Sequence, residues 1–237
     1  MRIARRHTPA APVRRTAMKV GIIGTGNVGG ALARSLVAAG HSVTLAGRDQ
    51  DKLGSVAAAT GATAGSVADA AAGADIVVLA VYWPAPTELA PQIAAVNPGT
   101  VIVDVTNPVT ADFSGPLFPG GPSASERLQE LVPGTPVVKA FNTLFAANLA
   151  DSAGHGVEID GLFAADDAAA GAQVAELIAS IGLRPVKVGG LVRARELEAL
   201  AWLNITLNMT TGGDWRSAFR LVGAPAGAVA TPAPAAA

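Results

Sequence analysis

The feature that most constrains the fold of this chain is a glycine-rich turn within Met18–Gly40. A short apolar run with β-branched residues, Val20–Ile23, leads into a G-x-G-x-x-G turn. Apolar residues then recur at helical spacing until Gly40. The segment therefore predicts a strand, a tight turn and a helix.

Each glycine of this turn has its own physical reason. Gly24 permits the tight turn at the strand end, Gly26 lets the backbone approach a pyrophosphate, and Gly29 lets the helix pack closely on the strand. The free N–H groups and the dipole of the helix N-terminus favour phosphate binding. The segment predicts a dinucleotide site, whereas the alternative is a doubly wound domain that keeps the loop without the ligand.

Composition narrows the possible classes of protein. The chain has 237 residues, half of them apolar, which suits one domain with a sizeable core. A net charge of −1 gives no electrostatic argument for binding nucleic acid or an anionic membrane surface. The absence of cysteine excludes disulfides and thiol catalysis, and the three widely spaced histidines form no metal-binding motif. We therefore expect no protein metal site.

The two ends differ from the rest of the chain. Residues 1–17 carry five arginines and no acid, which predicts a disordered basic extension. Alternatives are a start site at Met18 and, less favoured, a nucleic-acid-binding arm. Residues 223–237 consist mainly of Ala, Pro and Gly and predict a disordered tail. We find neither a secretory signal nor an apolar run long enough to span a bilayer, so we expect a cytoplasmic protein without membrane contact.

Between these ends, strand and helix patterns alternate. Strands are expected at Ser42–Ala46, Ala62–Ala64, Asp75–Val81, Val101–Asp104, Pro136–Phe141, Ile159–Ala164 and Arg184–Val188. Intervening helices predict an α/β fold, a Rossmann doubly wound and mainly parallel sheet. We expect an NADP-binding domain with extra strands over residues 18–188 and a small C-terminal helical portion over 189–222 that completes the cleft.

The residues after the second strand bear on the choice of cofactor. An acid at this point accepts from the ribose 2′-hydroxyl of NAD, whereas an arginine accommodates the 2′-phosphate of NADP. Here Arg48 comes first and Asp49 follows, with the Thr25 hydroxyl close enough to add a contact. The sequence favours NADP. The alternative is that Arg48 is a solvated charge and Asp49 binds the ribose.

Several polar and aromatic residues fall at expected carboxyl ends of strands. Trp83 is expected to line a ring pocket or to close the core, and Asn107 to bind ribose or nicotinamide or to start a turn. In the long helix Arg193–Met209, we expect Glu196 and Glu198 to be solvated or paired with neighbouring arginines.

An ordered set of motifs makes the chain, over roughly residues 18–223, similar to the NADPH-dependent reductases of the deazaflavin coenzyme F420 and related dinucleotide-binding reductases. These motifs are Gly24–Gly29, Ala46–Arg48, Asp104–Pro108, Val138–Thr143, Gly182–Pro185 and Ala194–Glu198. The resemblance implies hydride transfer between NADPH and C5 of a deazaflavin, a small-molecule acceptor as partner and, usually, a homodimer. Such chemistry requires no catalytic acid or base, because stacking two rings and excluding water supplies most of the rate.

Carried over by position, the resemblance implies a set of cofactor-binding residues along the sheet edge. The full expected set is Gly24, Thr25, Gly26, Asn27, Val28, Gly29, Arg48, Val81, Asn107, Ala140, Phe141 and Asn142. Thr25, Asn27 and Val28 would hold the pyrophosphate, Arg48 the 2′-phosphate and Val81 the adenosine side. Ala140–Asn142 would face the nicotinamide. The chain differs from characterised members at Gly47, where they often carry Ser, and at Phe141-Asn142, where they tend to carry Leu-His.

Two other functions remain open at this point. One is a dehydrogenase or reductase of a small hydroxy or imino acid, but such enzymes use a large helical C-terminal domain and the segment after Val188 is short. The other is a non-enzymatic NADP-binding module, which the replacement of the usual histidine by Asn142 suggests.

Overall fold

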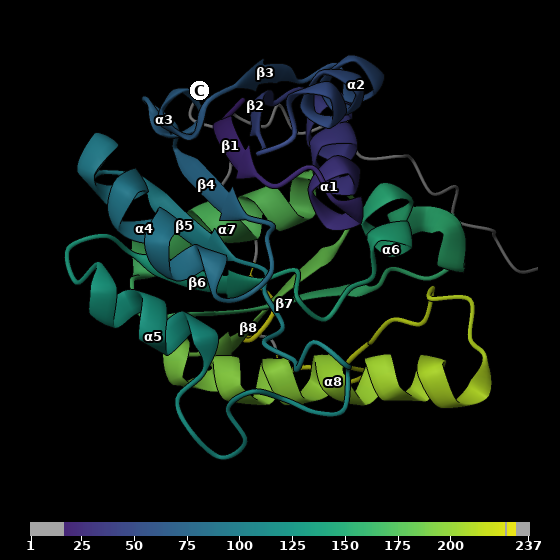
Figure 1. Ribbon diagram of the computed structural model, residues 1–237. Coiled ribbons are helices and arrows are strands. Elements are labelled where there is room, and N and C mark those ends of the chain that lie inside the picture. Colours follow the sequence, from purple (N-terminus) through teal and green to yellow (C-terminus); the bar gives the residue numbers. More distant parts are fainter. Residues whose placement is uncertain (1–16, 226, 231–237) are drawn as a thin grey trace, which may run out of the picture.

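The computed structural model describes residues 17–225 and 227–230 (Figure 1). Most of the two ends expected to be disordered, residues 1–16, 226 and 231–237, lies outside the described residues.

Strands and helices alternate as the sequence predicts. The strands are β1 (Lys19–Ile23), β2 (Ser42–Ala46), β3 (Thr63–Gly65), β4 (Ile76–Leu79), β5 (Val101–Asp104), β6 (Val137–Ala140), β7 (Asp160–Ala165) and β8 (Arg184–Gly189). The helices are α1 (Asn27–Ala38), α2 (Gln50–Thr60), α3 (Val67–Ala71), α4 (Ala85–Val96), α5 (Ala124–Leu131), α6 (Ala146–Ala150), α7 (Ala168–Ser180) and α8 (Ala194–Thr211), with short 3-10 helices at Ser152–His155 and Leu191–Arg193. Several helices begin where the sequence supplies a capping side chain, namely Asp49, Ser66, Ser123 and Asp167.

The strands form one eight-stranded sheet in the order β3-β2-β1-β4-β5-β6-β7-β8. β1 to β6 run parallel, and their order 3-2-1-4-5-6 is that of the Rossmann fold. β7 runs antiparallel to β6, and β8 is parallel to β7. The predicted doubly wound, mainly parallel fold is confirmed, and the antiparallel β7 is the feature that periodicity did not specify.

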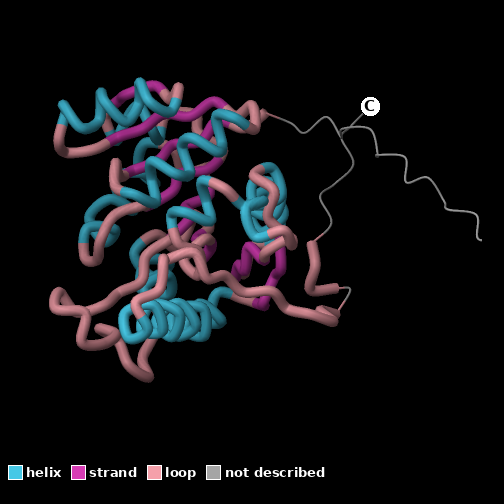
Figure 2. The backbone as a smooth tube through the Cα atoms, turned by 90° about the vertical axis from the view of Figure 1, so that its right-hand side faces the viewer, coloured by secondary structure: helices cyan, strands magenta, loops and turns pink. Residues whose placement is uncertain are grey.

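Helices cover both faces of the sheet (Figure 1). Apolar side chains of α1, α2, α6 and α7 form one buried cluster with one face, whereas those of α3, α4 and α5 pack on the other. On that second side α8 packs against β7 and β8 through Leu197, which is buried with Leu162, Ala164 and Val186. Figure 2 shows α8 nearly end-on, with loop segments beside it.

The end of the described chain departs from the expected disordered tail. Lys187 N donates to Ala228 O at 2.8 Å, and Ala230 N donates to Pro185 O at 3.0 Å. Val229 forms an antiparallel bridge with Val186. Residues 228–230 therefore pair with β8, because an edge strand offers unpaired backbone groups to a short apolar segment.

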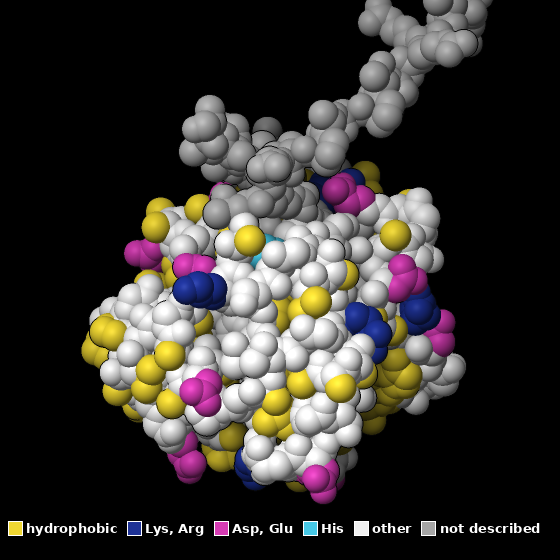
Figure 3. Space-filling model, turned by 90° about the horizontal axis from the view of Figure 1, so that it is seen from above, with side chains coloured by type: hydrophobic (Ala, Val, Ile, Leu, Met, Phe, Trp, Pro, Cys, Tyr) yellow, Lys and Arg dark blue, Asp and Glu magenta, His cyan; other side chains and the backbone are white. Residues whose placement is uncertain are grey.

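Charges on the face above β3 are of both signs. Figure 3 shows Lys and Arg side chains interspersed with Asp and Glu there, without a gathering of one sign.

Candidate active site at the carboxyl edge of the sheet

The glycine loop joins β1 to α1 with a geometry that only glycine permits at two positions. Gly24 has φ +126°, and a Cβ at this residue would overlap the Ala80 carbonyl oxygen. A Cβ on Gly29 would overlap the Gly24 carbonyl oxygen, so α1 packs directly on the turn. A Cβ on Gly26 would instead meet nothing within 4 Å. The space over Gly26 is open, as the close approach of a pyrophosphate requires.

The N-terminus of α1 presents its N–H groups to that open space. Gly26 is the N-cap residue, no side chain caps it, and the first turn contains no acid. The first N–H groups of a helix have no intrahelical partner, and the helix dipole adds a partial positive charge there. The loop Thr25–Val28 therefore fits an anionic diphosphate.

The loop after β2 lies against the glycine loop. A Cβ on Gly47 would lie 2.8 Å from Thr25 Cγ2, so the side chain of Thr25 fills the space that a serine at position 47 would need. Arg48 is exposed. Asp49 Oδ1 accepts from Lys52 N at 3.0 Å and caps α2. One carboxylate oxygen of Asp49 is thus engaged as a helix cap, whereas Arg48 is exposed next to Gly47.

Val81 follows β4, which neighbours β1 in the sheet. Its Cγ1 would be 3.2 Å from a Cβ on Gly24. Trp83 forms a T-shaped contact with Phe118, with ring centroids 5.4 Å apart. Trp83 thus packs against the loop that follows β5. Val81, rather than Trp83, borders the glycine loop.

Asn107 and Asn142 form a reciprocal pair at the ends of β5 and β6. Asn107 Nδ2 donates to Asn142 O at 2.8 Å, and Asn142 Nδ2 donates to Asn107 Oδ1 at 2.9 Å. Asn142 Nδ2 also donates to Leu197 O of α8 at 3.0 Å. The buried Asn142 Oδ1 has no hydrogen-bond partner among the described residues. This pair joins the sheet edge to α8.

The turn at Phe141 has a strained backbone. Phe141 has φ +62°, a conformation that bulky residues rarely adopt and that often marks functional sites. Ala140 and Phe141 are 0% and 1% exposed, whereas the side chain of Asn142 reaches Asn107. That Ala140–Asn142 face a nicotinamide stays a prediction.

The expected residues therefore fall into two groups along one sheet edge. Gly24–Gly29, Gly47-Arg48 and Val81 surround the end of β1, whereas Asn107 and Ala140–Asn142 follow β5 and β6. Since β1, β4, β5 and β6 are parallel neighbours, both groups lie at their carboxyl ends.

Sequence reasoning missed a buried ionic cluster formed by Asp104, Lys139 and Glu198. Lys139 Nζ lies 3.0 Å from Asp104 Oδ2 and 2.9 Å from Glu198 Oε1, and it also donates to Thr106 O. The expectation that Glu198 is solvated or paired with a neighbouring arginine is wrong. Arg195 binds Glu126 instead. A charged residue within each of two otherwise apolar strands, β5 and β6, was the available signal.

The charges of this cluster shift each other's proton affinity. Burial alone would lower the pKa of Lys139, but Asp104 and Glu198 outweigh it and raise that pKa. Burial raises the pKa of Glu198, and the nearby Asp104 adds to this, against the opposing effect of Lys139. The net effect is that the pKa of Glu198 lies above the ordinary value of a glutamate.

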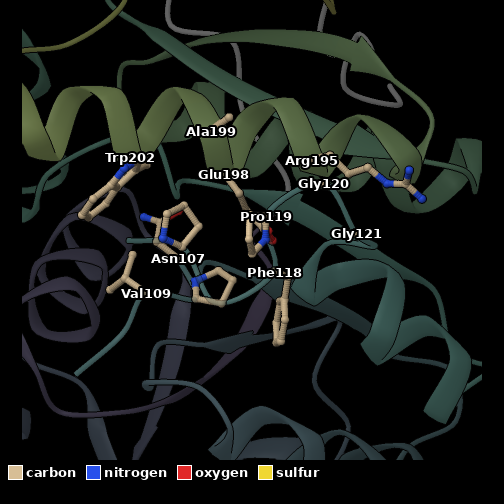
Figure 4. A pocket seen from close by; sticks show the side chains of 12 residues that line it. Asn107, Val109, Phe118, Pro119, Gly120, Gly121, Arg195, Glu198, Ala199 and Trp202 are labelled. Carbon is tan, nitrogen blue, oxygen red and sulfur yellow. The ribbon is translucent and has the colours of Figure 1, made fainter. Parts of the chain in front are cut away.

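A cavity of about 170 Å³ lies between α8 and the loop that follows β5 (Figure 4). Its walls are mainly apolar, and the polar side chains that reach it are Asn107, Arg195 and Glu198, with the Trp202 indole at one end. The remaining lining residues are Pro108, Val109, Pro116, Phe118, Pro119, Gly120, Gly121 and Ala199. Asn107 belongs both to this cavity and to the sheet edge, so the two adjoin.

Two further features were sought within the described part of the chain. Over residues 17–225 and 227–230, no group of three or more His, Asp or Glu side chains is placed to hold a metal ion. In the same part of the chain, no helix is both long and apolar enough to cross a membrane.

Comparison with known proteins identifies relatives over most of the chain. Residues 19–108 match the model of the family described as NADP oxidoreductase, coenzyme F420-dependent. The F420-dependent NADP reductase of Methanothermobacter thermautotrophicus is 34% identical over 211 residues, which cover 81% of this chain and 90% of the relative.

Two solved structures are also similar to this chain. A protein of Arthrobacter sp. FB24 assigned as an F420-dependent NADP-reductase is 28% identical with a TM-score of 0.73, covering 84% of this chain and 97% of that one. A hypothetical protein of Sinorhizobium meliloti is 35% identical with a TM-score of 0.65, covering 73% of this chain and 86% of that one.

Proposed function

Because this chain belongs to the family of coenzyme F420-dependent NADP oxidoreductases, we propose that it transfers a hydride between NADPH and coenzyme F420 or a similar deazaflavin or flavin acceptor. The observation that carries the proposal is the geometry at the ends of β1 and β2. An open glycine cradle and an uncapped helix N-terminus lie beside Arg48, while Asp49 is engaged in capping α2. This arrangement supports NADP as the dinucleotide.

The residues of the sheet edge divide the binding of NADPH between them. The backbone N–H groups of Thr25–Val28 bind the pyrophosphate, and the Arg48 guanidinium binds the 2′-phosphate as a charge-assisted donor. Val81 packs at the adenosine side. When bound, NADPH supplies the hydride. Asn107 and the turn Ala140–Asn142 hold the nicotinamide end.

The partner of NADPH is a small redox acceptor that enters beside α8. Within the described residues, the chain after β8 continues with a 3-10 helix and α8, which borders the cavity beside Asn107. The mainly apolar walls of that cavity favour a flat ring acceptor over the small hydroxy or imino acids of the alternative function. The same proposal includes a cytoplasmic protein that does not bind nucleic acid.

We also include a homodimer in the proposal. The solvent-facing side of α8 carries Leu203, Leu207 and Met209, which are 61%, 53% and 48% exposed. Neighbouring exposed apolar side chains on one helix are typical of a surface that a partner covers. Light scattering measures the molar mass in solution, and a monomer would contradict this part.

The turnover assay follows NADPH oxidation by the purified protein with F420, FMN, FAD and a quinone, and with NADH as the matched donor. We expect oxidation of NADPH with F420 and much slower oxidation of NADH. Tight NADPH binding in calorimetry without turnover on any acceptor would instead support the binding-module alternative. Turnover with hydroxy or imino acids only would support the dehydrogenase.

A further inference from the structure

We propose that the Glu198 carboxyl exchanges a proton with a ring nitrogen of the acceptor, which places one edge of its ring system in the cavity between α8 and the loop after β5. The inference rests on the proposed function, since it concerns the proton that accompanies the hydride. It assigns a catalytic role to a side chain in a site for which the resemblance implies no acid or base.

The two carboxylate oxygens of Glu198 differ in their hydrogen-bond partners. Oε1 accepts from Lys139 Nζ at 2.9 Å and from Ala124 N at 3.0 Å. No hydrogen bond or ion pair within the described residues involves Oε2. Because Glu198 lines the cavity and its side chain is 13% exposed, the second oxygen is the one available to a ligand. Figure 4 shows the side chain extending from α8 toward Pro119.

The hydrogen bonds of Asp104 separate it from the cavity. Asp104 is fully buried and accepts from Lys139 at 3.0 Å, from Ser125 Oγ at 2.7 Å and from Thr106 N at 2.9 Å. Both of its oxygens are engaged by these donors, so Glu198 is the carboxyl of the cluster with an oxygen left for a ligand.

Helices α5 and α8 contribute a second ion pair near the cavity. Arg195 and Glu126 bind each other at 2.6 Å, and Arg195 makes no ion pair with Glu198. Burial raises the pKa of Glu198, which supports a protonated carboxyl while the acceptor is being reduced.

The size of the cavity suits the edge of a ring rather than a whole acceptor. Its volume is about 170 Å³. An apolar cavity of about 150 Å³ holds one benzene molecule, so a single six-membered ring fits here. Among the residues that line the cavity, Glu198 is the one that carries a carboxyl group, so it is the proton donor at hand.

The step balances in both directions. The acceptor gains a hydride at carbon, which carries two electrons and one proton, and NADPH is oxidised by the same two electrons. Glu198 supplies the second proton: its O–H bond breaks as the N–H bond at the ring nitrogen forms. The resulting carboxylate lies beside Lys139 and takes a proton back from solvent. When the reaction runs in reverse, Glu198 accepts the proton from that nitrogen.

The first test compares Glu198→Gln with Glu196→Gln. Glu196 lies two residues before Glu198 on α8. It is exposed and pairs with Arg193 at 2.6 Å, so it is a matched control away from the cavity. Removal of a general acid costs about 10²–10⁴-fold in rate. We expect Glu198→Gln to lower kcat with F420 by about 100-fold while the Kd for NADPH changes by less than about twofold. The control keeps the kcat of the wild type.

The pH profile separates proton transfer from a structural role. In the wild type, kcat for acceptor reduction should fall as pH rises through the pKa of Glu198, and this fall should be absent in Glu198→Gln. A variant that is less stable but keeps the wild-type kcat and pH profile overturns the inference.

A measurement independent of turnover completes the test. Carbon-13 NMR of carboxyl-labelled protein follows the titration of Glu198, identified by the signal missing in Glu198→Gln or, if that variant does not fold, in Glu198→Asp. We expect a pKa above the ordinary value of about 4.3. Titration at or below that value overturns the inference even when turnover is normal. Absence of wild-type turnover with every acceptor would overturn the proposed function instead.

Discussion

Replacing Lys139 by methionine tests how the buried ionic cluster stabilises the fold. Lys139 and Asp104 have fully buried side chains, and their charges lie 3.0 Å apart. Methionine keeps much of the apolar stem but leaves Asp104 with two donors, Thr106 N and Ser125 Oγ, and no countercharge. Breaking a buried pair by removing one partner costs about 3–5 kcal/mol. We therefore expect the free energy of unfolding to fall by that amount.

The assay is urea and thermal unfolding followed by circular dichroism. For a chain of this size, about 1 kcal/mol corresponds to roughly 2–4 °C in Tm, so the expected decrease is about 6–20 °C. Lys52→Met is the control, because Lys52 is exposed on α2 and a surface substitution changes stability by less than about 0.5 kcal/mol. The double variant Lys139→Met with Asp104→Asn removes both charges and should recover at least half of the loss.

The pH dependence of this variant has a definite sign. The folded-state pKa of Lys139 is raised above its ordinary value of 10.5 by Asp104 and Glu198. The stability that its charge contributes is therefore fully present below that value and is lost only as pH rises through the raised pKa. The difference between wild type and Lys139→Met should persist unchanged through neutral pH. Equal losses in the Lys139 and Lys52 variants, or a double variant no more stable than the single one, would refute the reasoning.

Three further predictions concern the sheet edge and α5. Arg48→Ala should weaken NADPH binding by about 10–150-fold, because a hydrogen bond to a charged group contributes about 1.5–3 kcal/mol. NADH binding should stay constant. Equal losses of affinity for NADPH and NADH in calorimetry would refute the 2′-phosphate assignment. Gly29→Ala should abolish NADPH binding and lower stability by about 1–3 kcal/mol through overlap with the glycine turn. The control is Gly30→Ala, whose Cβ would lie 3.5 Å from its nearest neighbour and which should change neither NADPH binding nor stability. Similar Kd values for NADPH in the two variants would contradict the argument that Gly29 is needed for close packing of α1 on the glycine turn. The hydrogen bond from Arg195 lowers the pKa of Glu126 to about 2, so the stability that its charge contributes is fully present above the ordinary pKa of 4.5. The destabilisation by Glu126→Gln, measured by urea unfolding, should therefore vanish as pH falls toward 2; a constant difference would refute this prediction.

The sequence alone determined the local elements and the glycine loop. Helix starts at Asp49, Ser66 and Ser123 follow from side chains that cap the backbone a few residues away. The roles of Gly24 and Gly29 likewise depend on a turn between adjacent elements. These features were predictable because their causes lie close together in the chain.

Tertiary structure decided the features that join distant segments. Asp104, Lys139 and Glu198 come from β5, β6 and α8, and only their packing removes them from water and brings them within hydrogen-bonding distance. The burial of Phe141 and the pairing of Asn107 with Asn142 also depend on that packing. Hydrophobic periodicity shows which residues are buried, but it carries no information on which buried charge meets which partner, nor on the direction of a strand such as β7.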